Sequence, residues 1–458
     1  MKRETGSMLY TIFVLAWPTM LEQLMQTAVQ YIDTAMVGAL GTQATAAVGS
    51  TGTVNWLVNS VVASLGVGLL AFISQSMGAG EEEQAKNASA QAVMLVLITG
   101  TLLTVVITGL SEKVPLWMQV DPAIRDMAAR YFRILYLPML FRTAGILFGT
   151  VLRAAGDTRT PMWVGVGMNL INVILNLLLI YPTRAVRVFS VSLTLPGMGW
   201  GVEGAAWASA ISIIIGGLAM TALLFRHPQI SPAGRRFAPD SGILKACFRV
   251  AAPNMLQRFG TCMGYVVFAS MINALGDIST AAHTIANTVE SLFYIPGYGM
   301  QTAAATLAGN ALGARDGKRL RVLGKNMIAL EVGLMILTGS ALFLSAPRLM
   351  GIFSKDPEVI RLGATVLRMV AVSEPFYGVP IVIEGMMQGV GKTVAPFVYN
   401  LFGMWCVRIV GTFVCTRLLG LGLVSAWGCM IGHNVLLFFL FSIHYASGRA
   451  LPKIGENT

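Results

Sequence analysis

Long apolar runs, separated by short polar segments, follow one another along almost the whole chain. A helix that crosses a bilayer needs about 20 mostly apolar residues. Runs of that length predict twelve membrane-spanning helices, at residues 9–38, 46–77, 88–110, 123–152, 160–182, 200–225, 242–274, 281–311, 324–346, 358–388, 395–419 and 422–446. Prolines inside an apolar run are expected to kink its helix. They are Pro18, Pro138, Pro253, Pro296 and Pro375.

The two halves of the chain resemble each other. Matching residues are always separated by the same number of positions, as Pro18 is from Pro253. The matches are LAWPTML with VAAPNML at Pro18 and Pro253, ALGTQATAA with ALGDISTAA at Gly41 and Gly276, Gly78-Ala79 with Gly313-Ala314, Asp121-Pro122 with Asp356-Pro357, Gly156 with Gly391, and Pro161 with Pro396. Six matches at one ungapped offset indicate an internal duplication. Each copy holds six predicted spans, an even number, so the copies share one orientation. Parallel repeats of this kind are typical of transporters, whose substrate site lies between the halves.

The repeat sets the predicted domain organisation. Residues 1–225 form an N-terminal six-helix lobe, 226–241 a linker, and 242–458 a C-terminal six-helix lobe. The linker, RHPQISPAGRRFAPDS, is rich in Pro, Gly and basic residues and is expected to be exposed. The predicted fold class is an all-α integral membrane protein made of two parallel-repeat six-helix bundles.

Composition supports the membrane assignment and charge orients the chain. Hydrophobic residues make up 55% of the sequence and charged residues only 12%, whereas soluble domains carry about 25% charged residues. The net charge of +11 comes from basic residues in segments between the apolar runs, which is how topology is set and does not indicate nucleic-acid binding. Segments 226–249 and 312–325, which follow even-numbered spans, and both terminal segments are basic. Both termini are therefore predicted to be cytoplasmic, in a multi-pass protein of the inner membrane.

Other function classes lack their sequence signals. The five cysteines form no CxxC pair, the histidines show no metal spacing, and no GxxxxGK[ST] motif indicates ATP as the energy source. No cluster of catalytic carboxylates or histidines indicates a membrane-embedded enzyme. We therefore expect a protein that is not an enzyme and has no cofactor or metal. The N-terminal apolar run continues to about Met36, which favours a retained helix over a signal peptide.

Acidic residues inside the predicted helices are candidates for function, because a charge in hydrocarbon costs about 2.5–3.5 kcal/mol on insertion scales. They are Glu22, Asp33, Glu290, Glu331, Glu374 and Glu384. Asp33 stands alone on an apolar helix, and its repeat partner is Phe268, so the duplication does not explain it. Its carboxylate can hold a proton or a sodium ion. The alternative is a structural carboxylate near a helix end.

Two asparagines in the fifth predicted helix, Asn172 and Asn176, are four residues apart and share one helix face. Their amides can offer oxygen to sodium or a hydrogen bond to Asp33, or they can bond between helices without any ion. In the second half, Glu290, Glu374 and Glu384 have no acidic repeat partner. These carboxylates can bind cationic compounds or protons. The alternative is pairing with Arg258 or Arg408.

Several segments in order resemble one family of transporters over essentially the whole chain. They are PTMLEQLMQTAVQYIDTAMVGALG, ISQSMGAGEEEQA, RAAGDTRTP with its counterpart QGVGKTVAP, NLINVILN, GVEGAAWAS and HTIANTVESLFYIPGYGMQTAAATLAGNALGA. The sequence resembles the multidrug and toxic compound extrusion (MATE) family. The resemblance implies a V-shaped, alternating-access exporter that exchanges protons or sodium ions for organic, often cationic, compounds.

The resemblance also assigns roles to particular positions. It places an acidic coupling residue at Asp33 and completes the ion site with the face that carries Asn172 and Asn176. Some branches have Asp at the second of these positions, so Asn176 removes one negative charge from the site. Tyr131 in the fourth helix and Ser209 in the sixth match positions near that site.

Some family members carry a second cation site in the C-terminal half, with an acidic residue in the seventh helix. The seventh helix here offers Gln257, Arg258 and Thr261, so that site does not carry over intact. The residues expected to bind substrate are Glu290, Glu374, Glu384 and Gln257.

We therefore expect a secondary active multidrug exporter that acts as a monomer on small organic substrates among membrane lipids. The alternative is a lipid-linked precursor flippase of the same superfamily. Such flippases usually have a more cationic cavity, whereas the intramembrane charges here are mostly acidic. The 26 methionines suit adaptable binding surfaces, although Met is also ordinary filler in membrane helices.

Overall fold

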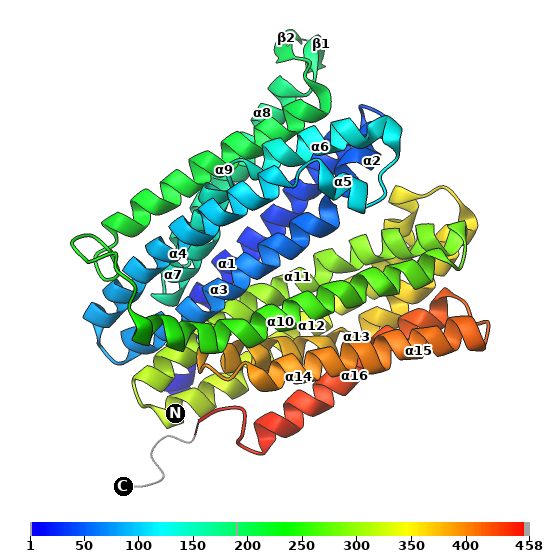
Figure 1. Cartoon of the computed structure of the whole chain (residues 1–458). Helices are drawn as coiled ribbons and strands as arrows, with labels where there is room; N and C mark the ends of the chain where they lie inside the picture. The colour runs from blue at the N-terminus through cyan, green and yellow to red at the C-terminus, as the bar shows by residue number, and fades with distance from the viewer. Residues whose placement is uncertain (1, 189–190, 453–458) are drawn as a thin grey trace. The chain divides into compact units, whose positions relative to one another are not determined.

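The computed structural model describes residues 2–188 and 191–452, with side chains described for 8–184 and 196–452. Helices dominate it (Figure 1). The first half contains α1 (Lys2–Gly38), α2 (Thr42–Ser50), α3 (Gly52–Gly78), α4 (Glu82–Gly109), α5 (Lys113–Trp117), α6 (Pro122–Tyr136), α7 (Met139–Ala154), α8 (Arg159–Leu179), β1 (Pro182–Val188), β2 (Val191–Met198) and α9 (Gly201–Arg226). The second half contains α10 (Ser241–Asn273), α11 (Asp277–Gly313), α12 (Gly317–Phe353), α13 (Pro357–Gly389), α14 (Val394–Phe402), η1 (Gly403–Ile409), α15 (Val410–Phe413), η2 (Val414–Leu418) and α16 (Leu423–Ala446).

Most of the predicted spans are helices that can cross a membrane. Within the described residues, nine helical segments are long and apolar enough, and the bent pair α6–α7 makes a tenth. The two remaining predicted spans correspond to α10 and α11, of 33 and 37 residues, which are long enough to cross a membrane but less apolar. Basic residues contribute to this in α10, which carries Lys245, Arg249 and Arg258. The chain is a multi-pass membrane protein, and the spanning of α10 and α11 stays a prediction.

The bend predicted at Pro138 is confirmed. Helix α6 ends at Tyr136, Pro138 is the N-cap of α7, and the two helix axes meet at 50°. Proline lacks the N–H that would continue the helix, which accounts for the break. The other four prolines lie inside unbroken helices, and kinks there stay predictions. The π-helical segments η1 and η2 were not predicted; such segments are frequent at functional sites.

The duplication is visible in the backbone. Three pairs of residues that are equivalent in the repeat adopt the left-handed conformation, which L side chains rarely take. They are Gly41 (φ 117°) with Gly276 (99°), Gly80 (74°) with Arg315 (52°), and Gly156 (89°) with Gly391 (80°). Helix caps repeat as well, because Asp121 and Asp356 each accept a 2.8 Å hydrogen bond from the backbone N–H two residues on. The two copies therefore share these turns and caps, although the break between α6 and α7 has no counterpart in the unbroken α13.

Repeat-equivalent residues also meet each other, where α3 crosses α11. A Cβ added at Gly78 would collide with the carbonyl oxygen of Asn310, and one added at Gly313 would collide with that of Gln75. Gln75 and Asn310 are themselves equivalent in the repeat, as are Gly78 and Gly313. Equivalent positions of the two copies thus contact each other reciprocally at this crossing. Only glycine lets the two backbones approach so closely.

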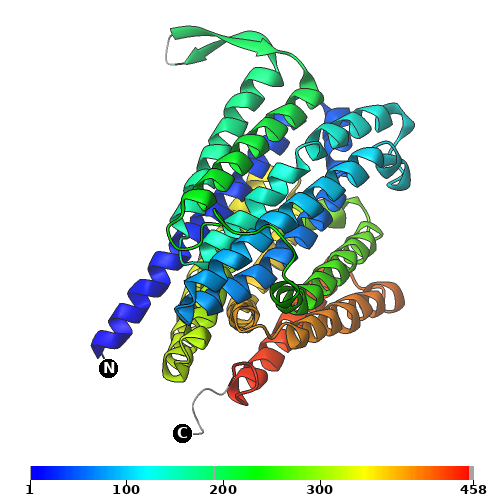
Figure 2. The same ribbon diagram turned by 60° about the vertical axis from the view of Figure 1, so that its left-hand side comes forward.

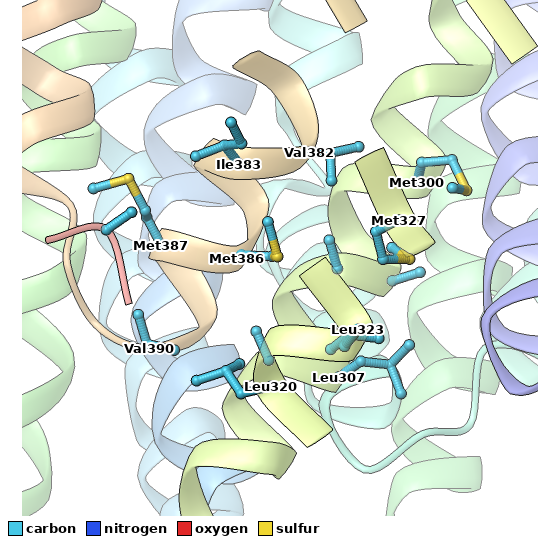
Figure 3. Packing of buried hydrophobic residues seen from close by; sticks show 14 of the residues in the cluster. Met300, Leu307, Leu320, Leu323, Met327, Val382, Ile383, Met386, Met387 and Val390 are labelled. Carbon is cyan, nitrogen blue, oxygen red and sulfur yellow. The ribbon is translucent and has the colours of Figure 1, made fainter. Parts of the chain in front are cut away.

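The helices group into two compact units. Unit 1 comprises Met1–Gln23, Val67–Glu81 and Lys245–Thr458, and unit 2 comprises Leu24–Gly66 and Glu82–Leu244. In unit 1, α13 packs against α11, α12 and α16. Figure 3 shows the methionine-rich core between α11, α12 and α13. The lobes of 1–225 and 242–458, which follow the repeat, remain a prediction.

In unit 2, α9 packs against α6, α7 and α8. Gly204 and Gly217 allow this, because a Cβ at either position would meet the backbone of α8 or α7. An antiparallel hairpin of β1 and β2, which was not predicted, extends beyond the ends of α8 and α9 (Figures 1 and 2). In the linker segment, Arg235 forms a 2.5 Å ion pair with Glu83 at the start of α4.

Candidate ion-coupling and substrate sites

Three helices of unit 2 bring the predicted coupling residues together. Asp33 comes from α1, Asn172 and Asn176 from α8, and Ser209 from α9. The four-residue spacing puts both asparagines on one face of α8, where they are 6% and 1% exposed. The Asn176 amide donates a hydrogen bond of 2.5 Å to Asp33 Oδ1. Helical periodicity predicted that the two asparagines share one face, and the family resemblance predicted that this face meets Asp33 and lies near Ser209.

The Asn172 amide makes a second contact with Asp33. Its neighbours are best satisfied when its nitrogen faces Asp33, at 2.8 Å from Oδ1 and 3.2 Å from Oδ2. In that orientation its oxygen accepts a 3.2 Å hydrogen bond from the Ser209 hydroxyl. Asp33 therefore faces two amide donors, and Ser209 orients one of them.

One acceptor in this cluster is left over. Among the described residues, the buried Oδ1 of Asn176 has no hydrogen-bond partner. A carbonyl oxygen without a hydrogen-bond partner, close to a carboxylate, can coordinate a sodium ion or accept a hydrogen bond from a bound proton donor. Tyr131, from α6, lies within electrostatic range of Asp33 but makes no hydrogen bond to it within the described part of the chain. The cluster can hold a small cation.

A second polar group in unit 2 was missed by the sequence reasoning. Arg142 on α7 donates a 2.7 Å hydrogen bond from Nη1 to Asn55 Oδ1 on α3. The Tyr136 hydroxyl on α6 donates to the same oxygen at 3.1 Å. The guanidinium also lies 5.4 Å from the Tyr136 ring centroid. The signal was present, because Arg142 is a basic residue inside an apolar run and such residues are rare in membrane helices.

In unit 1, amide donors surround one of the predicted substrate-binding carboxylates. Glu384 Oε1 accepts hydrogen bonds from Gln257 on α10 at 2.8 Å and from Gln388 at 3.1 Å. Glu384 Oε2 accepts one from Asn400 on α14 at 3.1 Å. Gln257 and Glu384 thus belong to one network. Hydrogen bonds of this kind stabilise the charged form of a carboxylate.

Glu374 lies in a different environment. It is 1% exposed, and neither of its carboxylate oxygens has a hydrogen-bond partner in the described structure; the same holds for Glu331 on α12, which is 0% exposed. Glu374 interacts electrostatically with both Glu331 and Glu290. Each side chain packs beside a glycine of the facing helix, Glu331 through its carboxylate at Gly378 and Glu374 through its Cβ at Gly339.

The alternative that a carboxylate of the second half pairs with an arginine is not seen. Among the described residues, no ion pair joins Glu290 or Glu384 to Arg258 or Arg408. The Arg408 guanidinium instead lies 4.2 Å from the ring centroid of Phe268, within electrostatic range of Glu290. The four predicted substrate-binding residues therefore form two groups, Gln257 with Glu384 and Glu290 with Glu374. Within the described residues, no group of three His, Cys, Asp or Glu side chains is placed to hold a metal ion.

Many long apolar helices, an internal repeat and polar clusters inside the helices define a polytopic membrane transporter. A family model described as MatE matches the chain twice, over residues 18–178 and 253–414. The two matches begin at Pro18 and Pro253, which are equivalent positions in the repeat. The chain belongs to the MatE family, as the sequence motifs indicated, and has its two-repeat fold.

Known proteins of similar sequence cover nearly the whole chain. A probable multidrug resistance protein NorM of Thermotoga maritima is 27% identical over 98% of this chain and 94% of its own length. The probable multidrug resistance protein YoeA of Bacillus subtilis is 25% identical over 90% of this chain and 87% of its own length. A solved structure of a MATE in its straight conformation has a TM-score of 0.88 at 23% identity, covering 97% of this chain and 96% of that one.

Proposed function

We propose that this protein exports small organic, often cationic, compounds across the cell's inner membrane in exchange for protons or sodium ions, by alternating access. The names of its relatives support the export of several drugs. The distribution of Lys and Arg supports cytoplasmic termini. We also propose that the protein works as a monomer and needs no cofactor beyond the coupling ion.

The observation that carries ion coupling is the cluster around Asp33. A carboxylate within an apolar span is costly unless an ion, a proton or polar groups compensate it. Asn172 and Asn176 supply dipoles without countercharge, and Asn176 Oδ1 remains unsatisfied within the described residues. A cation bound there would complete the site, and its release would change the charge on α1.

Transport in proteoliposomes tests this function. The purified protein is reconstituted, and efflux of an ethidium-like cation is followed under a sodium gradient and, separately, under a proton gradient. One of the two gradients should drive efflux, which identifies the ion. If neither drives any dye, and a pump-deficient host expressing the protein gains no resistance to cationic drugs, the proposed function is wrong.

A further inference from the structure

We propose that a pocket between the linker and the N-terminal turns of α4, the linker pocket, binds a phosphate ester that carries a primary ammonium group, as the headgroup of phosphatidylethanolamine does. The pocket has a volume of about 590 Å³ and lies wholly within unit 2. Its walls are Asn87 and Gln91 of α4 and residues of the linker between Gly234 and Ser241. The pocket is separate from the carboxylate clusters, so this inference goes beyond the proposed export function and does not depend on it.

Two contacts with α4 fix the linker and shape the pocket. Gln91 is 3% exposed, and its amide nitrogen donates a 2.8 Å hydrogen bond to the carbonyl oxygen of Ala238. The Gln91 side-chain oxygen accepts a 3.1 Å hydrogen bond from the backbone N–H of Asp240. On the other side of the pocket, Arg235 forms its ion pair with Glu83. The pocket is therefore built by specific contacts and is not a gap under a loose loop.

The repeat shows that this clamp belongs to the linker. The repeat equivalent of Gln91 is Asn326 on α12. The Nδ2 of Asn326 is buried and has no hydrogen-bond partner within the described residues, whereas both polar atoms of the Gln91 amide bond to the linker. The polar position on this helix is thus satisfied only in the copy that carries the linker pocket.

Two charged groups in the pocket lack a partner of opposite charge. Arg236 is exposed and forms no ion pair or hydrogen bond among the described residues. Asp240 caps α10, because its Oδ1 accepts hydrogen bonds from the N–H groups of Gly242 at 2.9 Å and Ile243 at 3.2 Å. Its carboxylate pairs with no Lys or Arg in the part of the chain that the structure describes. The pocket therefore offers one positive and one negative group to a ligand.

These two groups define the chemistry of the ligand. A guanidinium matches a phosphate in bidentate geometry, and a carboxylate accepts hydrogen bonds from an ammonium group. The Asn87 amide and the Ser241 hydroxyl supply neutral donors for further phosphate oxygens. A purely anionic headgroup would meet the carboxylate of Asp240 unfavourably. A phosphate ester with an ammonium group satisfies both charges at once.

The position of the pocket favours a lipid as the source of this headgroup. Asn87 and Gln91 lie near the start of α4, a helix able to cross a membrane, and the linker joins α9 to α10. Pockets with basic residues at the membrane ends of helices recognise lipid headgroups. Phe237, which follows Arg236, is 49% exposed and presents an apolar side chain to an acyl chain. With the proposed topology, the lipid belongs to the cytoplasmic leaflet.

Lipids that differ only in the headgroup test the pocket. The purified full-length protein is delipidated in detergent, and binding of each lipid is measured by native mass spectrometry at equal lipid concentrations. Phosphatidylcholine keeps the phosphate but its methylated ammonium cannot donate, and phosphatidylglycerol has no positive group. Phosphatidylethanolamine with the same acyl chains should bind about tenfold more tightly than either. Equal affinity for the three lipids would overturn the proposal.

Three variants assign the preference to the pocket. Asp240→Asn removes the charge but keeps an oxygen that caps α10, so it should abolish the preference for phosphatidylethanolamine over phosphatidylcholine and leave the latter's binding unchanged. Arg236→Gln should weaken binding of all three lipids by about tenfold. Arg226→Gln removes an exposed arginine at the end of α9, outside the pocket, and should change none of them. A full preference retained in Asp240→Asn, or equal effects of Arg236→Gln and Arg226→Gln, would overturn the site.

A soluble headgroup distinguishes a lipid from a free metabolite. Glycerophosphoethanolamine has the same charged groups without acyl chains, and it should displace the lipid only at concentrations about a hundredfold higher or more. If it bound as tightly as the lipid, the pocket would serve a soluble phosphate ester and the lipid source would be wrong. Dye efflux is measured separately, so failure of the linker pocket leaves the proposed export function standing.

Discussion

The two repeats keep the same turns but differ in their buried charges. At equivalent positions the first copy has Asn55 and Arg142, and the second has Glu290 and Tyr377. The Tyr377 hydroxyl lies 2.8 Å from that of Tyr298, whereas Arg142 bonds to Asn55. The left-handed turns and aspartate caps at equivalent positions are alike, whereas the break between α6 and α7 has no counterpart in the unbroken α13. The buried charges at the positions of Asn55 and Arg142 differ between the copies.

The carboxylates differ in the same way. Asp33 faces two amides, Glu384 accepts three amide hydrogen bonds, and Glu374 has no partner in the described structure. Amide donors stabilise an ionised carboxylate, and an unpartnered buried one is tolerated far better when neutral. Each environment therefore predicts a different response to substitution.

The largest effect is expected at Asp33. Asp33→Asn removes the charge that a coupling cation would balance, so ion-driven dye efflux from proteoliposomes should be lost. Folding and membrane insertion should be unchanged, because removing a costly charge from the membrane interior should not lower the free energy of unfolding. Asp126→Asn, an exposed carboxylate on α6, should export normally. Wild-type efflux with unchanged ion dependence in Asp33→Asn would move the coupling site to Glu290 or Glu384.

The next effect separates the carboxylates of unit 1 by stability. Glu384→Ala leaves the amides of Gln257, Gln388 and Asn400 without their acceptor, and should cost about 2–4 kcal/mol. Glu374→Leu abandons no donor and should stay within about 1 kcal/mol of wild type or be more stable. Thermal unfolding in detergent measures both. Equal losses would mean that Glu374 has a partner that the contacts do not reveal.

Helix positions followed from periodicity, and much of the unit 2 site followed from periodicity together with the family resemblance. Each of the twelve apolar runs coincides with a helix or a closely spaced series of helices. The spacing of Asn172 and Asn176 placed both on one face of α8, and the family resemblance placed that face beside Asp33. These properties depend on local pattern or on a single helix face. The constant offset between the two halves also reappears as matching left-handed turns.

Features that depend on tertiary packing were not predictable in this way. Gln388 is four residues from Glu384 on α13, but the other two donors, Gln257 of α10 and Asn400 of α14, are not related to Glu384 by any helical spacing. Arg142 carries a sequence signal of its own, a basic residue within an apolar run, but its contacts with Asn55 and Tyr136 depend on how α3, α6 and α7 pack. The hairpin was signalled by alternating residues in VSLTL, which are typical of a strand. The alternating segment is short and lies between two long apolar runs, so the helical pattern of those runs dominates the prediction for this region.

A moderate effect is expected when the missing negative charge is restored. Asn176→Asp places a second carboxylate beside Asp33, and two adjacent carboxylates resist ionising together. The pH of half-maximal dye efflux should rise by about one unit, or the sodium requirement should change by about tenfold. Proteoliposome efflux across a pH and sodium series measures this. An unchanged profile would show that Asn176 does not touch the coupling ion.

The smallest effect is expected at a turn that has the same backbone conformation in both copies but a different residue in each. Gly80 and Arg315 are repeat equivalents, both exposed and both left-handed, with φ of 74° and 52°. A side chain in that conformation costs roughly 1–2 kcal/mol, whereas glycine loses more chain entropy on folding, so the two terms partly cancel. Arg315→Gly should therefore gain about 0.5 kcal/mol, and Gly80→Ala should lose about 1 kcal/mol. Thermal unfolding midpoints of the two variants should move in opposite directions. If Arg315→Gly lowered the midpoint, the arginine side chain would be making a stabilising contact, and the two turns would be alike only in their backbone.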